Sequence, residues 1–78
     1  APKIDAERLP TSEELRPKRE LYVAQCSRCH PLISPSYFAK NADIDEILLR
    51  YRERKILTVE EADTISRYIK QITASSYE

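Results

Sequence analysis

One short run of residues constrains this chain more than any other: Cys26-Ser27-Arg28-Cys29-His30. Two thiols at this spacing can each bond to a vinyl group of the same haem, and the histidine that follows then lies beneath the iron. The C-x-x-C-H pattern therefore predicts one covalently attached haem c, bonded through Cys26 and Cys29, with His30 as the proximal iron ligand. Such a chain would fold around its cofactor.

Three other interpretations of the same residues stay open. A structural zinc site needs four protein ligands, so a carboxylate would have to join Cys26, Cys29 and His30, which is the only histidine. A thioredoxin-like redox pair belongs in a βαβ context, and no parallel-strand pattern flanks the motif. A simple exposed disulfide is the third alternative.

Length and charge agree with a cofactor-stabilised domain. The chain has 78 residues and a formal net charge of +0, from 13 basic and 13 acidic residues. Domains this small rarely bury enough apolar surface to be stable alone, and a haem would add a large apolar body to the core. Because the charges balance and no apolar run approaches the roughly 20 residues of a membrane span, we expect neither nucleic acid binding nor a membrane span.

The first residues, Ala1-Pro2-Lys3, include neither an initiator methionine nor a signal-like apolar core. Attachment of c-type haem is expected to take place outside the bacterial cytoplasm, so this start predicts the mature form of an exported, periplasmic protein. A trimmed recombinant chain would begin in the same way.

Helical periodicity predicts a first helix at about Pro17–Ser27, with Pro17 tolerated in its first turn. A second helix of about ten residues should follow Asp43, which with Glu46 has the form of a reciprocal cap. Its apolar stripe is Ile44, Ile47, Leu48 and Tyr51.

The last helix should begin at the capping box Thr58-Val59-Glu60-Glu61 and end at about Thr73. Its apolar stripe is Val59, Ala62, Ile65, Tyr68, Ile69 and Ile72. The chain contains no glycine, so a left-handed turn must use Asn41 or another residue with a side chain.

The remaining segments are expected to be irregular. Residues 1–16 form an N-terminal arm that can lie across the domain, 17–73 form the haem domain, and 74–78 form a polar tail. Residues 31–38 have the character of a loop rich in apolar side chains, which should line the proximal side of the haem, with Pro35 in contact with it. A carbonyl between Leu32 and Pro35 should accept the free ring N–H of His30.

These features resemble the small monohaem class I cytochromes c over Leu21 to Ile72. The resemblance rests on a helix that ends in C-x-x-C-H, a nearby proline, and the pattern Leu-Thr-x-Glu-Glu-Ala-Asp-x-Ile-x-x-Tyr-Ile. It implies an all-α, cytochrome c-like fold of three to four short helices wrapped around a covalently bound haem, with an exposed haem edge. It also implies that the first and last helices cross, Leu21 or Tyr22 meeting Tyr68 or Ile69.

The chain departs from this family on the far side of the iron. These cytochromes use a methionine there, and this chain has no methionine. In the subgroup resembling the cytochrome subunit of bacterial sulfite dehydrogenases, that methionine lies about twelve residues before the Asp of a Glu-Ala-Asp motif. Counting back from Asp63 gives Tyr51, which is therefore the candidate second metal ligand.

Tyrosine is a known haem ligand, and Arg50, Arg52 and Arg54 would favour the phenolate that ferric iron prefers. Lys40, Lys55, water, a partner-donated group or an empty position are the alternatives. The run that contains these arginines, Arg50-Tyr51-Arg52-Glu53-Arg54-Lys55, is either a solvated helix end or a docking patch for an acidic redox partner.

Two functions are compatible with these residues. The first is electron transfer to a redox partner protein, without enzymatic activity, since no acid pair, second histidine or nucleophile accompanies the haem. The alternative is binding or sensing of a small gas such as nitric oxide or carbon monoxide, at an open or labile sixth position. In either case the chain can be one subunit of a cytochrome complex.

Overall fold

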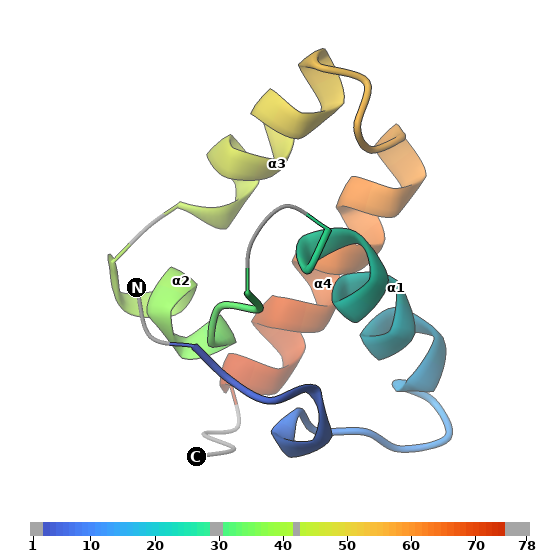
Figure 1. Cartoon of the computed structure of the whole chain (residues 1–78), viewed down its shortest axis with the longest axis vertical. Helices are drawn as coiled ribbons and strands as arrows, with labels where there is room; N and C mark the ends of the chain where they lie inside the picture. The colour runs from blue at the N-terminus through green and yellow to red at the C-terminus, as the bar shows by residue number, and fades with distance from the viewer. Residues whose placement is uncertain (1–2, 29–30, 42, 75–78) are drawn as a thin grey trace.

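Helix α4 (Val59–Ala74) is the central element, and the other three helices pack against it (Figure 1). They are α1 (Arg16–Cys26), α2 (Pro35–Asn41) and α3 (Ile44–Glu53), and a 3₁₀ helix, η1 (Ala6–Arg8), precedes them. This computed structural model describes residues 3–28, 31–41 and 43–74. Over those residues the chain is a compact all-α domain of four helices without a sheet, which confirms the all-α part of the expected fold.

The start of α4 is the clearest link between sequence and local structure. The Thr58 hydroxyl accepts from the Glu61 N–H at 3.1 Å, and the Glu61 carboxylate accepts from the Thr58 N–H at 2.9 Å. Both halves of the predicted capping box are therefore formed, and they satisfy two N–H groups that the first turn of a helix leaves without partners.

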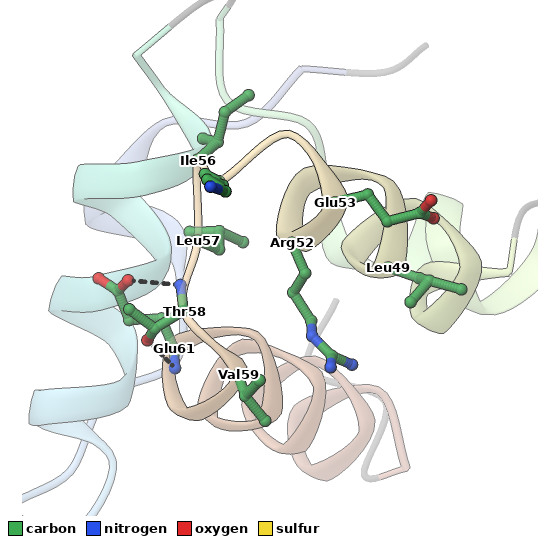
Figure 2. A pocket seen from close by; sticks show the side chains of 9 residues that line it. Leu49, Arg52, Glu53, Ile56, Leu57, Thr58, Val59 and Glu61 are labelled. Atoms are coloured by element: carbon green, nitrogen blue, oxygen red, sulfur yellow. Dashed lines mark hydrogen bonds between the residues drawn. The ribbon is translucent and has the colours of Figure 1, made fainter.

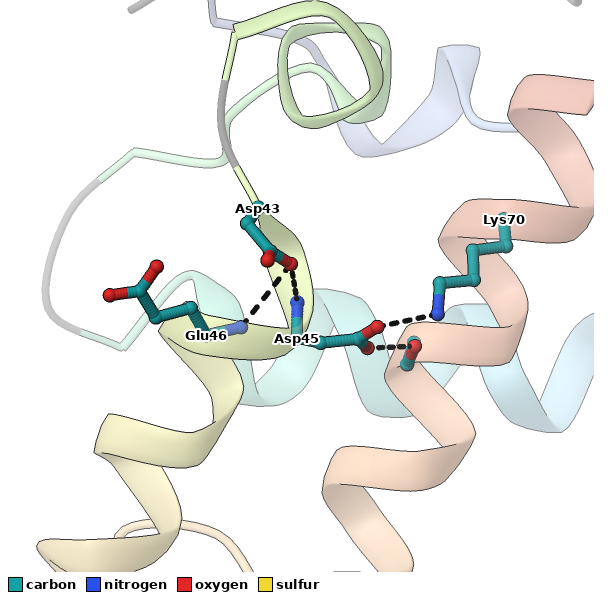
Figure 3. Close-up of polar contacts among 5 residues, drawn as sticks. Asp43, Asp45, Glu46 and Lys70 are labelled. Atoms are coloured by element: carbon teal, nitrogen blue, oxygen red, sulfur yellow. Dashed lines mark hydrogen bonds and ion pairs between the residues drawn. The ribbon is translucent and has the colours of Figure 1, made fainter.

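The start of α3 is capped from one side only (Figure 3). The Asp43 carboxylate accepts from the N–H groups of Asp45 and Glu46 at 3.0 and 3.4 Å. The expected return bond from Glu46 is not made within the described residues, because its carboxylate pairs with Arg50, one turn ahead, at 3.0 Å. That part of the reciprocal-cap prediction is wrong.

A side-chain contact fastens α3 to α4. Asp45 accepts from Lys70 and from the Ser66 hydroxyl, both at 2.6 Å (Figure 3). Both hydrogen bonds lower the pKa of the Asp45 carboxyl, and the one from Lys70 has the larger effect. The contact joins the first turn of α3 to the C-terminal half of α4.

The core lies on one face of α4 and confirms most of the predicted stripe. Its buried members include Ala62, Ile65, Tyr68, Ile69 and Ile72. Val59 does not belong to it, since its side chain is 61% exposed. Residue 59 is in the first turn of α4, beside an open groove rather than a packed helix, so the prediction that it is buried is wrong.

Helices α1 and α4 cross at two buried tyrosines, as the resemblance implies. The rings of Tyr22 and Tyr68 have centroids 5.8 Å apart. Each hydroxyl donates to a backbone carbonyl outside the helices, Tyr22 to Ile33 at 2.6 Å and Tyr68 to Pro10 at 2.7 Å. The crossing therefore also holds two irregular segments.

The N-terminal arm lies across the domain in extended form and as η1. The Ile4 N–H donates to the Leu32 carbonyl at 3.0 Å, next to an antiparallel bridge between Lys3 and Ile33. Leu9 is buried in the core. The arm therefore covers the segment that follows the C-x-x-C-H motif.

Two local features differ from simple expectation. Residues 31–38 were expected to form a loop, but α2 begins within them at Pro35. Proline suits the first position of a helix because its φ is fixed and an N–H is not needed there. The Tyr37 N–H donates to the Ser34 carbonyl at 3.0 Å. Lys55, in the short turn after α3, has a φ of 61° and is the residue in the left-handed conformation among the described residues.

No helix in the described part of the chain is long and apolar enough to cross a membrane.

The core assignment can be tested at Ile65, which is fully buried. Ile65→Ala should lower the free energy of unfolding by about 2–5 kcal/mol, since it leaves a cavity. The exposed Val59→Ala is the matched control and should change it by less than about 0.5 kcal/mol. Urea unfolding measures both, and equal effects would contradict this description of the core.

Candidate haem attachment site

The C-x-x-C-H motif begins at the C-terminal end of α1. Cys26 is the last residue of the helix, half-buried and packed against the hydrophobic core. Ser27 ends the helix as its C-cap, and its N–H donates to the Val23 carbonyl at 3.2 Å. Cys29 and His30 lie outside the described residues. The packing of α1 on α4 therefore determines where the motif starts.

The surroundings of Cys26 are apolar, and burial raises the pKa of its thiol to about 12. Redox pairs of the thioredoxin type need a thiol pKa lowered toward neutrality. A thiol held in its neutral form beside a core does not suit that chemistry. It does suit a thioether, which is an uncharged sulfur bonded to a large apolar group, so the described half of the motif fits a haem.

The carbonyls of Leu32, Ile33 and Ser34, which precede Pro35, already have at least one hydrogen bond each. Leu32 accepts from Ile4 at 3.0 Å, Ile33 from the Tyr22 hydroxyl at 2.6 Å, and Ser34 from the Tyr37 N–H at 3.0 Å. A carbonyl oxygen has two lone pairs and can accept a second donor. The prediction that a carbonyl between Leu32 and Pro35 accepts from His30 falls on a residue outside the described part.

The two other candidate residues occupy different environments. Pro35 is fully buried at the first position of α2. Tyr51 is half-buried on α3 and packs against the same core as Cys26. Its hydroxyl has no hydrogen-bond partner within residues 3–28, 31–41 and 43–74, unlike those of Tyr22 and Tyr68. The Tyr51 oxygen is thus free to bind another group.

The turn after α3 folds back onto Tyr51. Its backbone carbonyl accepts from the N–H of Ile56 at 2.9 Å and of Leu57 at 3.4 Å. Of the three arginines expected to favour its phenolate, Arg50 pairs with Glu46 and Arg52 lines a groove beside α4, while Arg54 is the exposed C-cap of α3.

The alternative lysine ligands are less well placed. Lys40 and Lys55 are both exposed, and neither is among the residues packed on the core. Within the described residues, no group of three His, Cys, Asp or Glu side chains is placed to hold a metal ion. The zinc alternative depends on Cys29 and His30, which lie outside them.

One feature of the site went unrecognised in the sequence. The Tyr22 hydroxyl holds the Ile33 carbonyl, and so ties the segment after the motif to the helix before it. The sequence feature that could have predicted this contact is a tyrosine within a helical apolar stripe, because a buried phenol usually finds a hydrogen-bond partner.

Comparison with protein-family models, with curated proteins and with solved structures finds no match.

The environment of Cys26 can be tested on the haem-free Cys29→Ser variant, which isolates this thiol. A thiol pKa of about 12 leaves almost no thiolate at pH 8, so alkylation by iodoacetamide should be at least about a hundredfold slower than for an ordinary thiol of pKa near 8.5. The same variant unfolded in guanidinium is the control. Equal rates in the two states would show that Cys26 is not buried.

Proposed function

We propose that this chain is a periplasmic monohaem c-type cytochrome that carries electrons. One haem c would be bonded to Cys26 and Cys29, with His30 as the proximal iron ligand. The observation that carries this proposal is the C-x-x-C-H motif at the end of a helix, α1, that crosses the C-terminal helix through Tyr22 and Tyr68.

Haem attachment requires one addition reaction at each cysteine. Each S–H adds across a vinyl double bond of the haem, which forms a thioether and releases nothing. The apolar surroundings of Cys26 favour the neutral thioether over a thiolate. When bound, the iron supplies a one-electron ferric–ferrous couple.

The far side of the iron is the unusual feature, because the chain has no methionine and a single histidine. We propose Tyr51 as the sixth ligand, on the strength of its half-buried position and its free hydroxyl. A phenolate is a hard anion that stabilises ferric iron, so the reduction potential should lie below that of a His/Met haem.

The missing methionine also favours a second candidate function. If no side chain holds the sixth position firmly, a small gas such as nitric oxide or carbon monoxide can bind there. A redox partner or a second cytochrome subunit that covers the site could instead donate the ligand.

Covalent haem attachment is the first test. Chain produced with a c-type haem maturation system should keep its haem after denaturation in acidic acetone. Cys26→Ser with Cys29→Ser should lose it, whereas Arg28→Ala, a change within the motif that removes no bonding residue, should keep it. A chain that carries zinc or a Cys26–Cys29 disulfide in place of haem would overturn the proposal.

The role of Tyr51 has a spectroscopic test. Tyr51→Phe should abolish a phenolate-to-iron charge-transfer band and allow the reduced protein to bind carbon monoxide, since it removes the ligand oxygen and keeps the ring. Tyr37→Phe is the matched control, because Tyr37 is also half-buried with a free hydroxyl within the described residues. Rapid carbon monoxide uptake by the unsubstituted protein would favour gas binding over electron transfer.

A further inference from the structure

Helix α3 ends in a hydrogen-bonded cap. The Lys55 N–H donates to the Arg52 carbonyl at 3.0 Å, and the Ile56 N–H donates to the Tyr51 carbonyl at 2.9 Å. Because Arg54 is the C-cap residue of α3, these two bonds have the register of a Schellman motif, in which the two residues after the C-cap bond back to the last turn. We call these two hydrogen bonds the α3 cap. Figure 2 shows the connection from α3 to α4 in which it lies.

The α3 cap depends on an uncommon backbone conformation at Lys55. Its φ of 61° lies in the left-handed region. A side chain is crowded in that region, so glycine, and less often asparagine, normally occupies this position of the motif. The chain has no glycine. Lysine therefore holds a conformation that glycine would adopt at lower cost, and the surrounding contacts must maintain it.

The residues that follow Lys55 supply those contacts. Ile56 is half-buried against the core, and Leu57 is a buried member of it. Thr58 comes next and is fixed by the capping box of α4. Only residues 54–57 lie between the last residue of α3 and Thr58. A connection this short needs a sharp reversal of the chain, which the left-handed residue provides.

Tyr51 is the residue that this connection holds most directly. It lies in the last turn of α3, and its carbonyl accepts from the N–H groups of Ile56 and Leu57 at 2.9 and 3.4 Å. The last turn of a helix frays easily when its carbonyls lose their partners. The other end of α3 is fixed separately by the Asp43 cap and by the contacts of Asp45 with α4. Loss of the α3 cap would therefore loosen the turn that carries Tyr51 before the rest of α3.

We propose that Lys55 is a positioning residue for Tyr51, and that it acts through its left-handed backbone and not through its charge. The proposal rests on the proposed function, in which the Tyr51 hydroxyl is the sixth iron ligand. A last turn that stays folded keeps this hydroxyl in one place. A frayed last turn would leave the sixth position open to a small ligand such as carbon monoxide.

The charge of Lys55 is the competing explanation. Lys55 is exposed, with no ion-pair partner within residues 3–28, 31–41 and 43–74, and a cation after the end of α3 interacts favourably with the helix dipole. Four variants separate the two explanations, since all of them remove the charge. Lys55→Gly and Lys55→Asn tolerate the left-handed region, Lys55→Ala tolerates it less, and the β-branched Lys55→Val tolerates it least.

The first measurement is amide hydrogen exchange on the full, haem-loaded chain. The Ile56 amide should exchange at least about fivefold faster in Lys55→Val than in Lys55→Asn, because the β-branched side chain disfavours the closed cap. Lys55→Ala should lie between them and serves in place of Lys55→Val if that variant does not fold. Lys55→Gly should exchange no faster than the unsubstituted protein. Equal exchange in all four variants would overturn the backbone role.

The second measurement is the ferric spectrum, with carbon monoxide uptake by the reduced protein. Lys55→Val should weaken the phenolate-to-iron band and take up carbon monoxide at least about fivefold faster than Lys55→Asn. Lys55→Asn should match the unsubstituted protein, although it lacks the same charge. Tyr51→Phe, measured alongside, gives the spectrum expected when the ligand oxygen is absent.

Two outcomes separate failure of this proposal from failure of the sixth-ligand assignment. If Tyr51→Phe alters the spectrum while Lys55→Val does not, even though its Ile56 amide exchanges faster, the α3 cap does not position Tyr51 and only the present proposal is overturned. If Tyr51→Phe leaves the spectrum unchanged, Tyr51 is not the ligand, and both are overturned.

Discussion

The crossing of α1 and α4 is the interaction on which the rest of the structure depends. A buried phenol is costly unless its hydroxyl finds a partner, and here both hydroxyls bond to backbone carbonyls of irregular segments. Tyr22 holds Ile33, next to the motif, and Tyr68 holds Pro10 in the arm. One helix pair thus orders the two segments that helical hydrogen bonds cannot order. The position of Cys26 at the end of α1 follows from the same packing.

Features that depend on residues within one helical turn of each other could be predicted from the sequence. The Thr58 and Glu61 cap is formed as expected, and the all-α class that the resemblance implies is confirmed. The exposure of Val59 and the course of the arm were not, because each depends on contacts between segments distant in the sequence. Likewise, Glu46 could cap its own helix or pair with Arg50, and the sequence pattern alone does not choose between them.

At the candidate site, too, some features could be predicted from the sequence and others needed the structure. The spacing of Cys26, Cys29 and His30 predicts the chemistry without any knowledge of the fold. It does not reveal that the Tyr51 hydroxyl is free while the Tyr22 hydroxyl is bonded, since both are tyrosines at helical core positions. Within the run 50–55, only geometry separates Arg50, which is paired, from Arg52, which is not.

The bond between Tyr68 and Pro10 joins positions 58 residues apart. At its other end the arm is joined to the segment after the motif, where the Ile4 N–H donates to the Leu32 carbonyl. The arm is thus held both by the last helix and by that segment, and it contributes Leu9 to the core between them. Removal of residues 1–10 would therefore cost apolar burial at Leu9 and leave the Tyr68 hydroxyl without its Pro10 acceptor.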